Sequence, residues 1–429
     1  MIVAKFGGSS MADAEQFKKV KRIIESNPHR SAVVVSALGK SELEPVKLTD
    51  QLIKLSQLKS NKLQYQNELV KIEKRLADIK AALALNVDIV ELLKPIQSPQ
   101  NNLTEAEITS RGEYFTATLL ADYLDWQMVD AADFISINNH QIDYDLSLKK
   151  LNQITNEKQH LIVPGFYARN EQQQITLLER GGGDTSGAIL ANLLDADLYE
   201  NWTDTSGILQ VDPRIINHSR KIYELTFDEL QELAYLGIQV FNSAAIHPVK
   251  IKGIPIQIKN TNHPQDLGTR VVLQRAHPTD ITGFAGKQNQ TIINLKQYQL
   301  NRDISAIAAL INCLRSQNYN FEYYQTAADQ LTLIFNQIED QELCNALDLI
   351  QQQFSNQLEI NVQNHIALVA IVSESLKQHP AMTGSFIDKL DQSDINVKSV
   401  FQATNDIKVV FGVNNCDYQN AIKMLYNQA

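Results

Sequence analysis

The first 35 residues combine a strand, a glycine turn, a helix and a second strand, and this order restricts the fold more than any other feature. Residues 2–6 form a short apolar run that stops at Gly7 and Gly8. Ser10, followed by Asp13 three residues later, is typical of a helix start, and the helix should run to about residue 26. Residues 31–35 are a β-branched run, typical of a buried parallel strand. Such a βαβ unit predicts an α/β fold with a mostly parallel sheet.

The same alternation continues for more than half of the chain. Residues 49–93 contain almost no glycine or proline and predict a helical stretch that a loop at 95–102 ends. A further helix is expected at 110–124. Strands that end in polar loops are expected at 161–166 and 196–202, and one at 254–259 closes this part. We therefore predict a three-layer α/β/α domain over residues 1–279.

The pattern changes near residue 280 to shorter elements that occur twice in the order β-α-β-β-α. The first unit is expected at about 290–360, and the second at 280–289 plus 361–429, with its first strand at 281–286 ahead of the first unit. Units of this kind are ferredoxin-like α+β modules. They contain no visible catalytic motif, so residues 280–429 are predicted to sense a ligand or to form a dimer.

Charge and composition exclude several classes of protein. The chain of 429 residues carries a net charge of −10, whereas binders of nucleic acid or of anionic membranes are usually basic. Its three cysteines are too few and too scattered for a disulfide framework or a zinc site. The N-terminal residues lack the pattern of a signal peptide, and no apolar run approaches the length of a membrane span. We expect a cytoplasmic protein without nucleic-acid or membrane partners.

Two glycine-rich turns are candidates for binding phosphate. Lys5 is followed by Gly7, Gly8 and Ser9 at a helix start, which offers a charge and bare amides to an anion. Residues 181–184, Gly-Gly-Gly-Asp, follow Arg180 and precede another helix, which Asp184 could cap. A plain glycine turn remains the alternative for each. By contrast, Gly39-Lys40-Ser41 imitates a P-loop, but Val34 stands where that motif requires glycine.

Two further motifs carry polar side chains. Ser110-Arg111-Gly112-Glu113 fits a helix capping box, or else a carboxylate directed at a substrate ammonium. Thr203 and Asp204 follow a predicted strand and precede Asp212-Pro213-Arg214, so they lie where open α/β sheets bind ligands. The nine histidines show no metal-ligand spacing.

At these motifs the chain resembles the aspartate kinases of the amino acid kinase superfamily, and it is most similar to the monofunctional enzymes of Gram-positive bacteria. The resemblance covers nearly the whole chain, and the doubled C-terminal unit is similar to the paired ACT domains of that family. It implies phosphoryl transfer from MgATP to the β-carboxylate of L-aspartate, giving 4-phospho-L-aspartate and ADP. This is the first step of lysine, threonine and methionine biosynthesis.

The resemblance also implies roles for individual residues. Lys5 with Gly7, Gly8 and Ser9 would hold the phosphates, and Asp184 would organise the centre, through Mg²⁺ or its waters. Around aspartate, Arg180 would bind the α-carboxylate and Glu113 the α-ammonium, with Ser36 and Thr49 in contact with the substrate. Thr203, Asp204, Leu209 and Arg214 would belong to the nucleotide loop. The residues that contact Mg²⁺ are not identified.

The chain departs from the family pattern at three positions. Gly183 stands where the family often has serine, Leu209 replaces a frequent tyrosine beside the nucleotide, and Gln239 replaces a second phosphate-binding lysine. The Gram-positive enzymes also lack that lysine, so Gln239 does not indicate inactivation.

Two other functions stay open at this point. One is a kinase for another acidic amino acid, and the other is a non-catalytic amino-acid sensor on a decayed kinase fold. The family further implies feedback by lysine, threonine or both, and a homodimer formed through the ACT modules. No residue motif selects the effector or fixes the oligomeric state.

Overall fold

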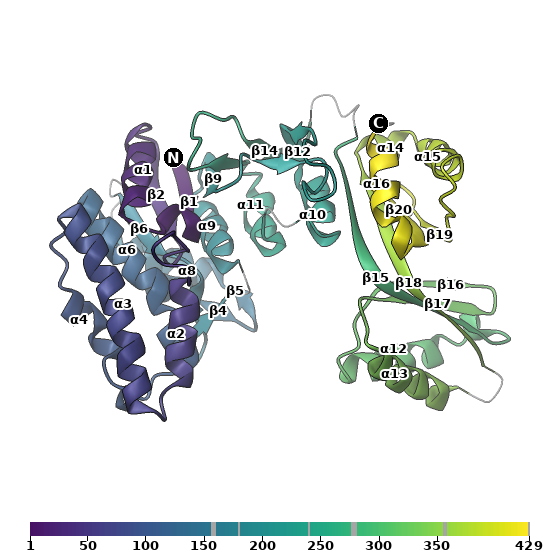
Figure 1. The fold of residues 1–429 in the computed structure, drawn as a ribbon, viewed down its shortest axis with the longest axis horizontal. Coiled ribbons are helices and arrows are strands. Elements are labelled where there is room, and N and C mark those ends of the chain that lie inside the picture. The colour runs from purple at the N-terminus through teal and green to yellow at the C-terminus, as the bar shows by residue number, and fades with distance from the viewer. Residues whose placement is uncertain (156–159, 179–180, 239–240, 276–280, 355–357, 428–429) are drawn as a thin grey trace. The chain divides into compact units, whose positions relative to one another are not determined.

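An eight-stranded sheet forms the centre of the first half of the chain, as predicted. The computed structural model describes residues 1–155, 160–178, 181–238, 241–275, 281–354 and 358–427. Its large sheet has the strand order β12-β14-β13-β9-β1-β2-β6-β3 (Figure 1). All neighbouring pairs are parallel except β13 and β14. Its strands are β1 (Ile2–Phe6), β2 (Arg30–Val35), β3 (Gln127–Met128), β6 (Leu161–Pro164), β9 (Leu198–Thr203), β12 (Glu224–Thr226), β13 (Ile256–Asn260) and β14 (Thr269–Val272).

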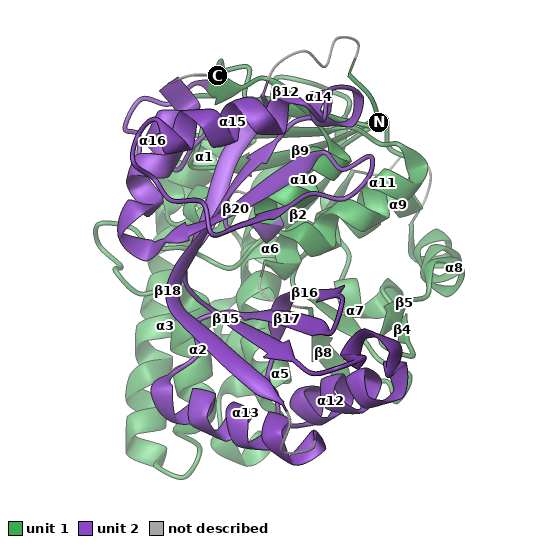
Figure 2. Cartoon of the chain, turned by 90° about the vertical axis from the view of Figure 1, so that its right-hand side faces the viewer, with its two compact units in different colours: residues 1–208, 221–234, 239–276 green, residues 209–220, 235–238, 277–429 purple. Residues whose placement is uncertain are grey.

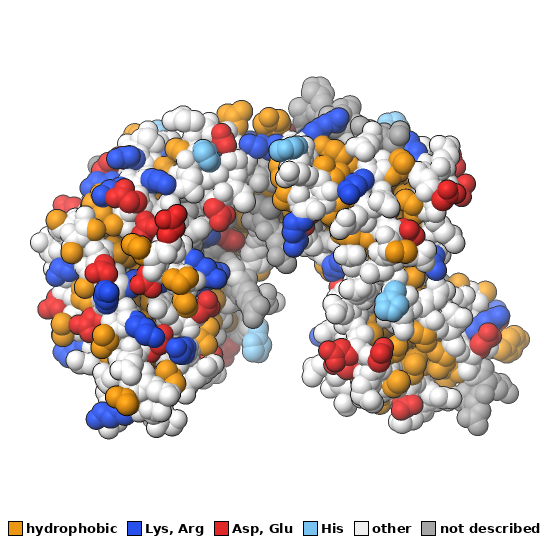
Figure 3. Space-filling view, viewed as in Figure 1, with side chains coloured by type: hydrophobic (Ala, Val, Ile, Leu, Met, Phe, Trp, Pro, Cys, Tyr) orange, Lys and Arg blue, Asp and Glu red, His pale blue; other side chains and the backbone are white. Residues whose placement is uncertain are grey.

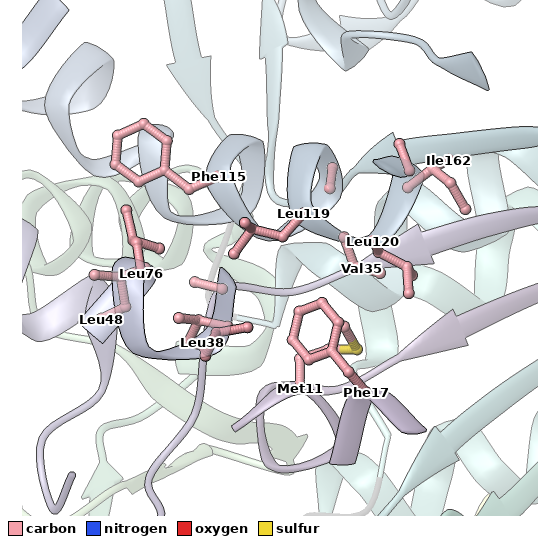
Figure 4. Close-up of a cluster of buried hydrophobic side chains, with 14 of the residues drawn as sticks. Met11, Phe17, Val35, Leu38, Leu48, Leu76, Phe115, Leu119, Leu120 and Ile162 are labelled. Carbon is pink, nitrogen blue, oxygen red and sulfur yellow. The ribbon is translucent and has the colours of Figure 1, made fainter. Parts of the chain in front are cut away.

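Helices lie on both faces of this sheet, which confirms the predicted layers. One face carries an extensive apolar core, which includes Phe17 of α1, Val35 of β2 and Phe115 of α6 (Figure 4). The other face carries α9. Its Gly183 and Val34 of β2 both lie close to Gly165. The helices are α1 (Ala14–Glu25), α2 (Leu48–Gln57), α3 (Lys62–Leu83), α4 (Ile89–Leu93), α5 (Glu105–Thr109), α6 (Arg111–Leu124), α7 (Ala131–Phe134), α8 (Tyr144–Ile154), α9 (Gly182–Leu193), α10 (Phe227–Tyr235) and α11 (Ile246–Lys252).

Short strand pairs and 3₁₀ turns complete this part. The turn η1 (Gly8–Met11) follows β1 directly. The small two-stranded sheets are β4 (Ile137–Asn138) with β5 (Gln141–Ile142), β7 (Tyr167–Arg169) with β8 (Ile175–Leu177), and β10 (Ile208–Leu209) with β11 (Lys221–Ile222).

The chain divides into two compact units, shown in different colours in Figure 2. Unit 1 comprises residues 1–208, 221–234 and 239–276, and unit 2 comprises residues 209–220, 235–238 and 277–429. Two short segments from the first half thus cluster with the C-terminal half. The predicted boundary between residues 279 and 280 lies outside the described residues and stays a prediction.

Unit 2 has the doubled β-α-β-β-α order that the sequence predicts, on a single antiparallel sheet with the order β16-β17-β15-β18-β20-β19. Helices α12 and α13 pack on the first module and α15 and α16 on the second, each pair over its own apolar core (Figure 1). The elements are β15 (Gly283–Lys296), α12 (Ile304–Ser316), β16 (Phe321–Ala327), β17 (Gln330–Phe335), α13 (Asp340–Gln353), β18 (Glu359–Val372), α14 (Ser375–Gln378), α15 (Met382–Asp391), β19 (Ser399–Phe401), β20 (Lys408–Asn414) and α16 (Tyr418–Asn427).

One long strand replaces two that the sequence predicts. The strand expected at 281–286 and the one expected at 291–295 are both parts of β15. Its first half pairs with the end of β18, and its second half pairs with β17 and with the start of β18. The register shifts between Lys287 and Ile292, so a bulge joins the two halves without ending the strand.

The surface of unit 1 mixes both signs of charge. On the face shown in Figure 3, lysines and arginines are interspersed with acidic side chains. This agrees with the net charge of −10 and with the absence of a basic footprint. Among the described helices, none is long and apolar enough to cross a membrane.

Candidate active site

Lys5, Asn201 and Asp184 meet where β1 and β9 approach their carboxyl ends. Lys5 and Asn201 are directly paired across the parallel strands, so both side chains point to the face that carries α9. The Lys5 Nζ lies 2.6 Å from Asp184 Oδ1, and Asn201 Nδ2 donates to the same oxygen over 2.8 Å. Lys5 is only 8% exposed. The cluster therefore holds one positive and one negative charge in a largely desolvated place.

Asp184 does not cap α9, and this sequence-based interpretation was wrong. The residue at the helix cap is Gly181, which has no capping side chain, and Asp184 lies in the first turn. Its carboxylate faces Lys5 and Asn201 instead, and the Tyr199 hydroxyl donates to its backbone carbonyl over 3.0 Å. Asp184 has the sequence spacing of a helix cap, but it forms a long-range ion pair with Lys5.

The turn after β1 brings backbone amides to the same edge of the sheet. The Gly7 amide donates to the Trp202 carbonyl over 3.0 Å, which extends the β1–β9 pairing. The amides of Gly8 and Ser9 start the turn η1 and therefore have no intrahelical partner. The Gly39 amide donates to Gly8 O, and a Cβ atom at Gly39 would lie 2.3 Å from that oxygen. The approach of these two loops requires glycine at position 39.

Ser36 occupies the space in which a side chain at position 183 would lie. A Cβ atom at Gly183 would lie 2.8 Å from the Ser36 hydroxyl and 3.5 Å from Lys5 Cε. Ser36 follows β2, and its amide donates to Phe6 O. The end of β2 therefore brings a hydroxyl to the space beside Gly183 and Lys5.

Glu113 is a buried carboxyl with one unused oxygen. Its side chain is 5% exposed, Oε1 accepts from the Ala37 amide over 3.1 Å, and Oε2 is buried with no partner. Burial raises its pKa to about 8, and the Ala37 amide offsets this only in part. With this pKa, the carboxyl is mostly protonated at neutral pH.

The capping box predicted at Ser110 and Glu113 does not form. The Ser110 hydroxyl donates to Glu107 O, and the capping box lies one helix earlier, between Thr104 and Glu107. Glu113 accepts instead from the Ala37 amide, which belongs to another element. This contact can be seen only in the folded structure.

The remaining predicted residues fall into three groups. Thr49 lies half-buried in the first turn of α2, and Thr203 closes β9 with its hydroxyl 3.1 Å from Asp204 Oδ1. Leu209 and Arg214 belong to unit 2, where the exposed Arg214 is paired with Asp212 at 2.6 Å. Arg180 and Gln239 lie outside the described residues.

The electrostatics of this edge favour a phosphate group. The first turns of η1 and α9 both lie beside Lys5, and helix N-termini carry partial positive charge. Within the described part of the chain, no cluster of three His, Cys, Asp or Glu residues could hold a metal ion. Asp184 is a carboxylate at this edge, and its Oδ1 makes the contacts with Lys5 and Asn201 given above.

Sequence reasoning assigned no role to Tyr199, and it placed Asn201 only in the polar segment before the nucleotide loop, without its contact to Asp184. Both belong to β9, and Asn201 lies beside Lys5 on the neighbouring strand. The available signal was the two-residue period of the strand, which places Tyr199, Asn201 and Thr203 on one face. Using it required the knowledge that β1 and β9 are neighbours.

Comparisons with known proteins agree with this fold. Residues 1–260 match the amino acid kinase family, and residues 369–428 match the ACT domain. Aspartokinase 3 of Bacillus subtilis (strain 168) is 31% identical, over 100% of this chain and 98% of its own length.

Solved structures of aspartate kinases have the same architecture. The enzyme of Clostridium acetobutylicum, described as an important allosteric enzyme, has a TM-score of 0.91 and 32% identity, over 100% of this chain and 99% of its own. Aspartokinase III of E. coli, in complex with aspartate and ADP (R-state), has a TM-score of 0.78 and 22% identity, with the same coverage. The same E. coli protein is also known in complex with lysine and aspartate (T-state).

Proposed function

The chain belongs to the aspartokinases of the amino acid kinase family, and we propose that it transfers the γ-phosphoryl group of MgATP to the β-carboxylate of L-aspartate. The observation that carries this proposal is the cluster of Lys5, Asp184 and Asn201 beside two glycine-rich helix starts. The E. coli relative, which shares the fold, binds aspartate and ADP.

The chemical difficulty is that a carboxylate must approach a γ-phosphate although both are anionic. Catalysis is then mainly positioning and charge neutralisation. In our proposal Lys5 and the amides of Gly8 and Ser9 hold the phosphates at the carboxyl end of β1. Mg²⁺, bound with ATP, supplies further positive charge on the phosphate oxygens.

Asp184 orients Lys5 before the nucleotide arrives. The ion pair at 2.6 Å fixes the Lys5 ammonium at the strand end, and the bond from Asn201 fixes the carboxylate in turn. A lysine restrained in this way keeps its charge where the transferring group gains negative charge. Asp184 is also the described carboxylate best placed for Mg²⁺ or its waters.

L-Aspartate would be bound through its α-amino and α-carboxylate groups. We assign the ammonium to Glu113, whose Oε2 is buried without a partner, and the α-carboxylate to Arg180, whose planar guanidinium suits bidentate pairing. Ser36 and Thr49 contribute hydroxyls near the β-carboxylate, and Thr203, Asp204, Leu209 and Arg214 contribute to the nucleotide loop.

The decisive experiment is a coupled ADP-release assay on the full chain. The acceptors, each offered with MgATP, are L-aspartate, L-glutamate and N-acetylglutamate. The Asp184→Asn variant serves as the control. We expect ADP release with L-aspartate and at least tenfold less with the other two. Equal or better turnover of glutamate would identify a kinase for another acidic amino acid, and no turnover with any acceptor would identify an amino-acid sensor.

Unit 2 is proposed to carry feedback regulation and the contact between two copies of the chain. Its paired modules support this, as do the exposed apolar side chains of Tyr298, Ile304 and Tyr324. An effector shifts the enzyme only by its different affinity for active and inactive states. Inhibition of the intact enzyme by L-lysine and L-threonine tests the effector, and sedimentation equilibrium tests the homodimer. No inhibition by either amino acid would contradict the regulatory assignment.

A further inference from the structure

Three residues at the end of β13 connect the loops on which we place the nucleotide. We call Asn260, Thr261 and Asn262 the 260–262 turn. β13 runs parallel to β9 with Asn260 opposite Thr203, so this turn leaves the sheet at the same carboxyl edge as Lys5. No motif of the sequence assigned a role to it.

Asn260 holds the loop that follows β9. Its side chain is 5% exposed, and its Nδ2 donates to the Asp204 carbonyl over 3.1 Å and to the Ser206 hydroxyl over 3.0 Å. Its Oδ1 accepts from the Asn262 amide over 2.8 Å. Both ends of this amide are therefore used within the protein, and the loop at 204–206 is anchored although it has no regular secondary structure.

Thr261 holds the turn that follows β1. Its side chain is 1% exposed, and its hydroxyl oxygen lies 2.7 Å from the Ser10 hydroxyl, in a buried hydrogen bond. Its amide donates to Thr203 O over 2.9 Å. Ser10 belongs to η1, the turn that starts with Gly8. One residue thus contacts both the turn after β1 and the end of β9.

Asn262 extends these contacts to the helix behind the turn η1. Its Oδ1 accepts from Gln16 Nε2 over 3.2 Å and from Lys19 Nζ over 2.8 Å, both in α1. These bonds are exposed, so they are weaker than the buried pair of Thr261 and Ser10. The buried contacts therefore carry the connection.

We propose that Asn260 and Thr261 are positioning residues that set the distance between the phosphate turn at Gly8–Ser9 and the nucleotide loop at Thr203–Asp204. This rests on the proposed placement of the nucleotide on these two segments. Neither side chain is available to the ligand, because each is buried and bonded within the protein. Their effect is to keep the two segments at a spacing that a single ATP molecule can bridge.

The consequence is specific to the nucleotide. A small displacement of one binding segment against the other weakens a ligand that contacts both, and misplacement of about 1 Å can cost about 10²-fold in rate. Of the described residues that we assign to aspartate, Glu113, Ser36 and Thr49 form no hydrogen bond with the 260–262 turn. Loss of the turn should therefore alter MgATP affinity and leave aspartate affinity unchanged.

The test uses the full chain with Thr261→Val, which keeps the shape and removes the hydroxyl, and Thr261→Ser, which keeps the hydroxyl. We expect Thr261→Val to raise the KM for MgATP and the Kd for ADP about tenfold, with the aspartate KM within twofold of the wild type. Thr261→Ser should stay within threefold of the wild type in all constants. Ser10→Ala should match Thr261→Val, and the double variant should be no worse than either, because both remove the same hydrogen bond.

Ser147→Ala is the matched control for the loss of a buried hydroxyl. Ser147 is fully buried and accepts from the Ser136 amide, and among the described residues no hydrogen bond joins it to the 260–262 turn. It should lower Tm and leave the kinetic constants unchanged. If Thr261→Val lowers Tm in the same way while ADP affinity stays within twofold, or if the aspartate KM rises in parallel, the positioning role is overturned. ADP titration by calorimetry needs no turnover, so failure of the proposed reaction in the wild type remains distinguishable.

Discussion

The buried Glu113 predicts a steep dependence of aspartate affinity on pH. Burial raises the pKa of this carboxyl to about 8, so in the free enzyme at pH 7 it is about 90% protonated. If it receives the substrate ammonium, it must bind aspartate as the carboxylate. Each aspartate bound at pH 7 then releases about 0.9 proton from Glu113. A change of pH alone should therefore change the affinity for aspartate.

The size of the effect follows from this pKa. Apparent aspartate affinity is weakened by a factor of 1 + 10^(pKa − pH), which is about 30 at pH 6.5, about 11 at pH 7 and about 1.3 at pH 8.5. The aspartate KM should therefore fall roughly 25-fold between pH 6.5 and pH 8.5. An ordinary exposed glutamate is fully ionised over this range and would give no such dependence on pH. The MgATP KM should not follow the same curve, because Glu113 contacts the Ala37 amide and no part of the phosphate turn.

Two assays check this reasoning. The first is the aspartate KM at saturating MgATP across the pH range, and the second is calorimetry of aspartate binding at pH 7 in two buffers of different ionisation enthalpy, which counts the released protons. Glu113→Gln, which keeps the shape and has no titratable proton, is the control and should bind aspartate weakly with no dependence on pH. A flat aspartate KM in the wild type, with no proton released, would refute both the role of Glu113 and the argument from its burial.

Three further variants test the rest of the site. Lys5→Met should keep the fold, since its chain packs at a strand end, but should lower kcat by about 10²–10³-fold; full activity in a folded variant would contradict the phosphate role. Gly183→Ala should displace the Ser36 hydroxyl, because the new Cβ would lie 2.8 Å from it. This should raise the aspartate KM roughly three- to tenfold. An unchanged aspartate KM would show that Ser36 does not contact the substrate. Arg180→Ala should weaken aspartate by roughly 2–5 kcal/mol and leave ADP affinity nearly intact, as calorimetry with each ligand measures; unchanged aspartate binding would remove Arg180 from the site.

The layers of the fold were predictable because they follow from local periodicity. The buried β-branched run at 31–35 and the amphipathic helix before it appear in the structure as β2 and α1. The doubled order of unit 2 was readable for the same reason. Local pattern could not decide whether two neighbouring strand segments form one continuous strand. The sequence predicted two strands, at 281–286 and 291–295, but pairing with β18 on both sides of the bulge keeps β15 in one piece.

The sequence named the residues of the candidate site, and several of their contacts in the structure differ from those that local patterns predict. Thr104-x-x-Glu107 and Ser110-x-x-Glu113 have the same capping spacing, and only the first forms the box. Glu113 does not cap its helix, because its Oε1 accepts from the Ala37 amide of a distant segment. Similarly, Asp184 has the spacing of a cap but pairs with Lys5. In both cases a long-range partner overrides a local preference, and a single sequence does not contain the strand order that supplies the partner.

The same strand order bears on the glycine at position 183. In the sequence, Gly183 leaves the proposed phosphate-binding turn without the serine hydroxyl of the family pattern. Across the sheet, the end of β2 brings Ser36 into the space that this side chain would fill, next to Lys5. A serine at position 183 would require the Ser36 hydroxyl to move, since both would compete for one position. The two residues should therefore vary together, and a Gly183→Ser, Ser36→Gly double variant should recover more aspartate affinity than Ser36→Gly alone. No recovery in the double variant would mean that the two hydroxyls are not equivalent and that Ser36 has a role of its own.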